Sequence, residues 1–392
     1  MADPHVVILG HAADRTGPPI YLLQLLRALD RRGLRITVVL LRGGELLAEL
    51  QELAEVRVVG EPVDLDIASP GRIAEEPARL AARRAQLADL RDLSLVVVNT
   101  AWSIHALAWL PPGTHPVVSV VHELGAGVGD LLQAEPLAQL LRSDRFVAGC
   151  RAVVAMLTDV HDVPPDRIDL LPYGVEIGAE EVVAAHRGVL GADPSSFLVV
   201  AAAVADRRKS PDLFVHLAAT ARRRRPDVAW AFRWIGAEWD DDRLADAHAD
   251  RDLLDATELV RFVPPTTRLR EWLAAADVFV LPSREDAFPL AAVEAALAGV
   301  PILCFRSGGI GDLVRDDAGA MVAYPDLEAM ASWLIDWHDD PARRDAAGDA
   351  ARARALEHHD VRRHAETFGE LVIHRFCGAS GPDPSSPREG EA

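Results

Sequence analysis

The chain has 392 residues, nearly half of them hydrophobic, which is enough for two domains with substantial cores. Its formal net charge of −19 at pH 7 argues against binding to nucleic acid and to anionic membrane surfaces, because both require clustered cations. Three widely spaced cysteines, Cys150, Cys304 and Cys377, fit a reducing compartment without metal sites. With neither a signal peptide nor a membrane-spanning run in view, we expect a cytoplasmic protein.

Short apolar runs alternate with helix-length amphipathic segments, which is the pattern of βα units around parallel sheets. In the first half the expected strands are residues 6–9, 35–40, 56–59, 95–99, 117–121 and 146–148, with helices such as 20–32 and 77–88 between them. The second half repeats the pattern with strands 198–202, 230–235, 259–262, 278–281 and 302–305. We therefore predict an α/β protein made of two doubly wound, Rossmann-like parallel-sheet domains.

Composition changes mark the domain limits. We expect a first domain at 1–172, a connection rich in Pro and Gly at 173–196, a second domain at 197–360, a C-terminal helix at 361–377 and a tail at 378–392. The tail is rich in Pro, Gly and Ser and is expected to be disordered.

Residues 282–305 are the most informative segment, because a polar loop after strand 278–281 leads into an Ala-rich helix framed by two acids. The first amides of a helix lack intrahelical partners and attract anions, and Pro289 suits the first helical position. Seven residues separate Asp286 from Glu294. Glu294 then lies roughly 7 Å further along the helix axis, about the step from a diphosphate to the ribose of one nucleotide.

This segment resembles the acidic motif of retaining GT-B glycosyltransferases of the family 4 (glycosyl transferases group 1) type. In that family an acid, seven residues and a Glu grip a nucleotide-sugar donor, and the first acid is most often Glu followed by Gly-Phe-Gly. Here Asp286 is followed by Ala287, Phe288 and Pro289, and Glu285 stands one place earlier. The departure leaves open whether Asp286 or Glu285 contacts the sugar. An ordinary βα unit with solvated acids is the alternative.

Lys209 is the lone lysine among 41 basic residues, which suggests that a compact ammonium is needed at that position. It lies in the turn after strand 198–202, where the resembled family carries cations that bind the donor diphosphate. Arg208 is the candidate second cation. Fixed cations there would stabilise the negative charge that develops on the leaving diphosphate. The alternative is a solvated basic turn.

The same turn departs from the family pattern at three positions. Ser210 replaces the glycine that usually follows the lysine, and Ala203 and Val204 stand where the family has Gly and Arg. Residues 307–312 resemble the family's Gly-Gly-Ile-Pro-Glu loop, with Asp312 in place of Glu, and we expect this loop to shape the backbone.

In the first domain the resemblance points to Gly17 and His122. Gly17 follows the first strand, where family members carry a glycine loop close to the diphosphate and the acceptor; a simple turn is the alternative. His122 ends strand 117–121, where the family has a His near the donor sugar; a loop cap is the alternative. His11 is expected to be structural.

Two other charged runs are read as surface. The run Arg222–Arg225 sits at a predicted helix end, where cations are favourable. Residues 240–242 match the Asp-x-Asp of metal-dependent GT-A enzymes only superficially and are read as a solvated loop. Neither a His/Cys cluster with metal spacing nor a G-x-S-x-G elbow occurs in the sequence.

The resemblance implies a metal-independent, retaining glycosyltransferase (hexosyl or related transfer) that uses a nucleotide-diphosphate sugar as donor substrate and needs no cofactor. The implied catalytic residues are His122, Asp286 and Lys209. The implied donor-binding residues are Gly17, Arg208, Lys209, Glu285, Asp286, Ala287, Phe288, Pro289, Leu290 and Glu294. Glu294 would hold the ribose, and amides near Phe288 to Leu290 would hold the diphosphate with the two cations.

Three other functions stay open. A nucleotide-sugar epimerase and a catalytically silent, GT-like binding subunit use the same fold. A dinucleotide oxidoreductase is the weakest rival, because no G-x-G-x-x-G follows either first strand. The sequence names neither the sugar, the base, the acceptor (a glycan, a lipid-linked or a small-molecule metabolite) nor the oligomeric state.

Overall fold

The computed structural model describes residues 3–59, 77–125, 134–178, 184–238, 241–315 and 317–378. The chain divides into two compact units. The first unit comprises Met1–Gly149, Val153–Pro172 and Val361–Ala392, and the second comprises Cys150–Ala152 and Tyr173–Asp360. Residues 179–183 of the expected connection and 379–392 of the expected tail lie outside the described residues.

The first unit is built on a seven-stranded parallel sheet with the order β3-β2-β1-β4-β5-β6-β7. Its strands are β1 (His5–Gly10), β2 (Arg35–Leu40), β3 (Glu55–Val58), β4 (Leu93–Val98), β5 (Val117–Val121), β6 (Arg145–Ala148) and β7 (Ile168–Leu170). Every residue of β1 is buried, as expected for a central strand that is covered on both faces.

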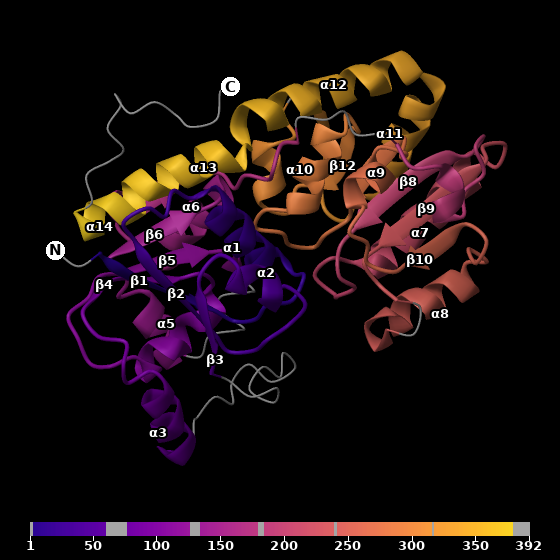
Figure 1. Ribbon diagram of the computed structural model, residues 1–392. Helices are drawn as coiled ribbons and strands as arrows, with labels where there is room; N and C mark the ends of the chain where they lie inside the picture. The colour runs from indigo at the N-terminus through magenta and orange to yellow at the C-terminus, as the bar shows by residue number, and fades with distance from the viewer. Residues whose placement is uncertain are drawn as a thin grey trace. The chain divides into compact units, whose positions relative to one another are not determined.

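The helices of the first unit include α1 (Gly17–Ala28), α2 (Leu47–Gln51), α3 (Pro77–Gln86), α5 (Ala134–Leu140), α13 (Val361–Phe368) and α14 (Arg375–Cys377), and α6 (Arg151–Ala155) joins it from Val153 on. A 3₁₀ segment, Ala101–Trp109, follows β4. The C-terminal α13 packs against α1 within this unit (Figure 1). The Tyr21 hydroxyl on α1 bonds to Nε2 of His364 on α13 at 2.9 Å, so the last described helices belong to the core of the first unit.

The second unit contains a six-stranded parallel sheet with the order β10-β9-β8-β11-β12-β13. Its strands are β8 (Phe197–Ala202), β9 (Trp230–Ile235), β10 (Val260–Val263), β11 (Val278–Leu281), β12 (Ile302–Phe305) and β13 (Gly319–Val322). Its helices include α7 (Pro211–Arg224), α8 (Ala245–Leu253), α9 (Leu269–Leu273), α10 (Leu290–Leu297), α11 (Leu327–Asp339) and α12 (Pro341–His358) (Figure 1).

Both sheets reverse their chain order at one point. In the first sheet β1 lies beside β4, and in the second β8 lies beside β11. Doubly wound sheets bind ligands at the carboxyl ends of the strands at such a switch point. The prediction of two doubly wound α/β domains is confirmed. In the second sheet, the loops after β8 and β11 are the expected location of a ligand site.

The run Arg222–Arg225 lies at the end of α7, and its side chains bind neighbouring segments of the second unit. Arg222 donates to the carbonyls of Leu254 and Asp255, and Arg225 binds both carboxylate oxygens of Asp339 on α11 at 2.7 and 2.8 Å. Each of these cations is engaged by its own unit, consistent with the surface interpretation.

Candidate functional site

The turn after β8 presents the lone lysine. The amide of Lys209 donates to the Asp206 carbonyl at 3.1 Å and to its carboxylate at 2.8 Å. Ser210 then adopts the left-handed conformation with φ of 67° and precedes Pro211, the first residue of α7. A side chain costs about 1–2 kcal/mol in this conformation, which explains why the resembled family has a glycine at this place.

Lys209 and Asp286 form a buried ion pair. The ammonium of Lys209 donates to Oδ2 of Asp286, and the two side chains are only 14% and 5% exposed. Burial lowers the pKa of Lys209, and the Asp286 carboxylate opposes this shift. Because the pair joins the loops after β8 and β11, it lies at the switch point of the second sheet.

Arg208 adds a second cation beside this pair. Its Nη1 lies 4.0 Å from Oδ1 of Asp286 and donates to the Glu285 carbonyl at 3.3 Å, while its side chain stays 42% exposed. Its Nη2 lies 3.6 Å from the Asp206 carboxylate. Two cations therefore converge on the Asp286 carboxylate, in a position that suits an anionic ligand.

The backbone of the acidic loop is held on both sides. The Asp286 amide donates to the Ser307 carbonyl at 3.0 Å, and the Gly309 amide donates to the Asp286 carbonyl at 3.0 Å. A Cβ at Gly309 would lie 1.9 Å from the Ala287 oxygen, and Gly308 has φ of 145°. The glycine loop after β12 thus fixes the position of Asp286, as expected for a loop that shapes the backbone.

The start of α10 offers unpaired amides. Pro289 is the N-cap and Leu290 the first helical residue, so the predicted first position of Pro289 is wrong by one residue. Within the described part of the chain, the amides of Ala287, Phe288 and Leu290 donate to no other residue. No acid stands in the first turn of α10 to compete for an anion.

Glu294 lies on α10 with its carboxylate half-buried. Burial raises the pKa of Glu294, and Arg270 opposes this shift. No described residue donates a hydrogen bond to the carboxylate or pairs with it. The Glu294 carboxylate is therefore able to accept hydrogen bonds from a ligand of the second unit.

Gly17 and His122 belong to the first unit, whereas Lys209, Asp286 and Glu294 belong to the second. Gly17 is the first residue of α1, after β1, and a Cβ built there meets no atom within 4 Å. The packing of the first unit therefore does not require a glycine at this position. The carbonyl of the neighbouring Pro18 accepts from the Asn99 side chain at 3.0 Å, which ties the start of α1 to the end of β4.

His122 directly follows β5 and stacks edge-on against Tyr21, with ring centroids 4.8 Å apart. The pKa of His122 is lowered to about 3, mainly by burial and secondly by the nearby His11. Burial also lowers the pKa of His11 to about 4. Both imidazoles are therefore neutral at pH 7.

Glu123 is a half-buried acid whose role the sequence pattern did not indicate. It accepts hydrogen bonds from the Thr100 hydroxyl, from the Ala101 amide at 3.4 Å and from the His122 amide at 2.9 Å. Burial raises the pKa of Glu123 and these bonds oppose the shift. Glu123 thus fixes the backbone at His122 to the loop after β4.

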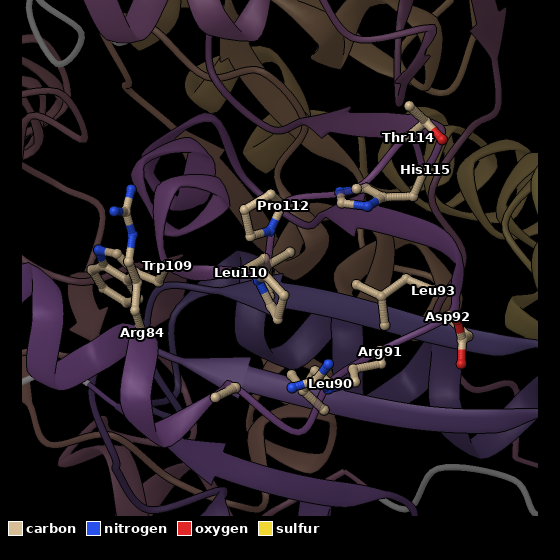
Figure 2. A pocket seen from close by; sticks show the side chains of 13 residues that line it. Arg84, Leu90, Arg91, Asp92, Leu93, Trp109, Leu110, Pro112, Thr114 and His115 are labelled. Carbon is tan, nitrogen blue, oxygen red and sulfur yellow. The ribbon is translucent and has the colours of Figure 1, made fainter.

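A cavity of about 730 Å³ lies elsewhere in the first unit (Figure 2). It is lined by Arg84, Ala88, Leu90, Arg91, Asp92, Leu93, Trp109, Leu110, Pro111, Pro112, Gly113, Thr114 and His115. The cavity lies at the amino ends of β4 and β5 and contains none of the predicted site residues. Ligands of doubly wound sheets bind at the opposite, carboxyl ends, so we do not assign the donor to this cavity.

Within the described ranges, no three His, Cys, Asp or Glu side chains gather in a way that could hold a metal ion. Asp241 of the Asp-x-Asp-like run pairs with Arg243 at 2.6 Å, and Asp240 lies outside the described residues. Nor does any helix in those ranges have the length and apolar character needed to cross a membrane.

Two family models match most of the chain. The model for "Glycosyltransferase Family 4" matches residues 16–178, and the model for "Glycosyl transferases group 1" matches residues 183–354. The second match includes Lys209, Asp286 and Glu294.

Curated proteins and solved structures give the same picture. The chain is 31% identical to a D-inositol 3-phosphate glycosyltransferase of Pseudarthrobacter chlorophenolicus over 265 residues, and this match spans 61% of each chain. It is 27% identical to the protein of that name from Kineococcus radiotolerans over 379 residues, or 87% of each chain. A structure of Anabaena HepE in complex with UDP and glucose is similar in fold, with a TM-score of 0.76, 16% identity and coverage of 94% of this chain and 99% of HepE.

Proposed function

We propose that this chain, which belongs to the glycosyl transferases group 1 family of GT-B glycosyltransferases, transfers a hexosyl or related group from a nucleotide-diphosphate sugar with retention of configuration. The observation that carries the proposal is the Lys209–Asp286 pair, with Arg208 beside it, at the switch point of the second sheet. The two cations, Lys209 and Arg208, and the unpaired amides at the start of α10 suit a diphosphate.

The donor diphosphate would bind Lys209, Arg208 and the amides around Phe288 and Leu290. As the bond between the sugar C1 and the phosphate oxygen breaks, the negative charge on the leaving diphosphate increases. Cations that are already in place stabilise that charge without reorganisation. The transition state would be oxocarbenium-like, as in glycoside chemistry generally.

Glu294 would hold the nucleotide's ribose. Its carboxylate is half-buried and unengaged by described residues, and it is carried one to two turns into α10. A carboxylate in that position can accept from both ribose hydroxyls. The raised pKa of Glu294 falls back when such donors bind it, because hydrogen bonds favour the charged form.

Of the two acids, we propose Asp286 as the one that contacts the donor sugar. Oδ2 of Asp286 is bound to Lys209, while a carboxylate has about four acceptor positions in all. Oδ1 can therefore accept from a sugar hydroxyl while Oδ2 holds the ammonium. Asp286 would therefore bind the donor sugar and also orient Lys209, the cation that binds the diphosphate.

In the transfer step, the acceptor oxygen would bond to C1 on the face that the diphosphate leaves. A phosphate oxygen of the leaving group would take the acceptor's proton, so no protein base is required. We assign His122 a supporting role on the first unit as a neutral hydrogen-bonding group toward the acceptor, in line with its lowered pKa. Exclusion of water would limit hydrolysis of the donor.

The names of relatives suggest the first substrates to test. HepE was crystallised with UDP, with UDP-glucose and with UDP and glucose, and the curated relatives are named D-inositol 3-phosphate glycosyltransferases. Several of these relatives are matched over less than two thirds of their length. We therefore propose UDP as the nucleotide and a phosphorylated polyol as the acceptor class.

A thermal-shift panel of UDP, GDP, ADP and dTDP, alone and as their sugars, tests donor binding. We expect one nucleotide to raise Tm, because ligands that bind only the folded state stabilise it by mass action. Product analysis by NMR after incubation with an inositol phosphate then gives the anomeric configuration. Conversion of the sugar without an acceptor would favour an epimerase, and binding without turnover would favour a silent subunit. No stabilisation by any nucleotide would contradict the proposal.

A further inference from the structure

Arg284 and Asp212 form a two-pronged ion pair beside the donor loops. Nη1 of Arg284 lies 2.9 Å from Oδ1 of Asp212, and Nη2 lies 2.6 Å from Oδ2. Both side chains are about one quarter exposed. Asp212 is in the first turn of α7 and Arg284 is in the loop after β11, so the pair joins the two loops that carry Lys209 and Asp286.

Arg284 also holds the residues that immediately precede Lys209. Its Nη1 donates to the Arg207 carbonyl at 2.9 Å, and its main-chain amide donates to the Arg208 carbonyl at 2.8 Å. Lys209 is thus bracketed on its N-terminal side by two bonds to Arg284 and on its C-terminal side by Asp212. None of these bonds touches the Lys209 side chain itself.

The bonds made by Arg284 and Asp212 lie on both sides of a strained turn. Ser210, between Lys209 and α7, has the left-handed conformation that side chains disfavour. Such a residue persists only where the surrounding structure over-determines it. The planar guanidinium suits this task, because it binds a carboxylate with two parallel bonds and a carbonyl at once, which an ammonium cannot do.

Resting on the proposed role of Lys209 toward the diphosphate, we propose that Arg284 is a positioning residue that fixes the Lys209 ammonium on Asp286, with Asp212 as its anchor. The alternative is an ordinary surface pair, which would contribute little to stability and nothing to the position of Lys209. An experiment can distinguish a positioning role from an ordinary surface pair, because Lys209 is the lone lysine of the chain. It gives one NMR signal when lysine is isotope-labelled.

The first measurement is the ¹³Cε signal of Lys209, in protein without lysine in any tag, for the wild type, Arg284→Met and Asp212→Asn. We expect both variants to shift and broaden this signal and to move the titration of Lys209 toward that of an exposed lysine. The matched control is Arg225→Met, which breaks the pair with Asp339 at the other end of α7. An unchanged Lys209 signal in both variants, or an equal change in Arg225→Met, overturns the proposal.

The second measurement is turnover of UDP-glucose with D-inositol 3-phosphate. Arg284→Met should lower kcat by roughly tenfold or more, because a displacement of the Lys209 ammonium by about 1 Å can reduce the rate by that factor. The affinity for UDP should change less. Guanidinium ion added at millimolar concentration should restore part of the activity of Arg284→Met but not that of Lys209→Ala. If the wild type fails to turn over any donor, the proposed function fails, whereas the NMR result still decides the role of Arg284.

Discussion

The Lys209 ammonium is bound to the Asp286 carboxylate, an acid 77 residues further along the chain. This pair brings together the turn after β8 and the loop after β11, which are neighbours only because the sheet reverses its order between them. It also leaves the Arg208 guanidinium beside the pair and partly exposed. Lys209 is thus the most direct residue with which to test the proposed function.

Lys209→Ala should lower kcat by at least roughly tenfold, the scale of one lost transition-state contact. Asp286 would also be left as a buried carboxylate without its ammonium, so a fall in Tm should accompany the loss. Steady-state kinetics with the donor identified by thermal shift, together with a melting curve, measure both effects. Glu328→Gln, which removes an exposed partner of Arg223, is the control for a lost surface pair. Near-normal turnover in Lys209→Ala would remove the assignment of this cation to the diphosphate.

Glu294→Gln should weaken the binding of free UDP by roughly tenfold or more, the lower end of the value of one hydrogen bond to a charged group. The amide keeps the shape of the carboxylate, so Tm without ligand should stay close to that of the wild type. Calorimetric titration with UDP measures the change. The same titration with inorganic diphosphate is the internal control, because that ligand has no ribose and should bind both proteins alike. Equal affinity for UDP in the two proteins would contradict the ribose assignment.

Ser210→Gly should stabilise the second unit by roughly 0.5–1 kcal/mol. Relief of the left-handed conformation contributes about 1–2 kcal/mol, and the added chain entropy of glycine in the unfolded state offsets part of it. Urea unfolding measures the difference. Ser210→Ala is the control, since it keeps the Cβ and should give no gain. A loss of stability in Ser210→Gly would mean that the weak hydroxyl contacts at 3.4 Å matter more than the backbone.

The strands that the sequence predicts with matching bounds are runs of mostly apolar residues. β2, β5, β9, β11 and β12 begin and end at the predicted residues, because buried parallel strands are continuous runs of apolar residues. β7 and β13 were missed. β7 has three residues at a sheet edge and β13 has the sequence Gly-Ala-Met-Val, so neither carries a periodic signal. β7 and β13 are defined by the neighbouring strand with which each of them pairs.

The sequence indicates separate segments of the candidate site, but the contacts between them follow only from the fold. The family assignment from residues 282–305 and Lys209 is confirmed by the matching family models. The contacts of Arg284 and Asp212 carry no motif, since their side chains meet only after the two loops have folded. Tyr21 and His364 are 343 residues apart and look like ordinary helix positions. Pairings across such distances in the chain depend on the topology of the sheet.

The half-buried imidazoles of His11 and His122 should make the stability of the first unit fall as the pH falls. The pKa of His11 is about 4 and that of His122 about 3 in the folded protein, against 6.5 when unfolded. Between pH 6.5 and about 4 the unfolded chain therefore binds more protons than the folded one, and the free energy of unfolding decreases as protons are added. Each group contributes a slope of up to about 1.4 kcal/mol per pH unit.

Glu123 acts in the opposite direction, because burial raises its pKa and protonation then favours the folded state above about pH 4.5. The histidine contribution is isolated by comparing variants. Urea unfolding of the wild type, His11→Asn and His122→Asn between pH 7.5 and 4.5 should show a shallower loss of stability in each variant. His358→Asn, on an exposed side chain of α12, should leave the slope unchanged. Parallel slopes in all four proteins would show that these imidazoles already take up protons in the folded state.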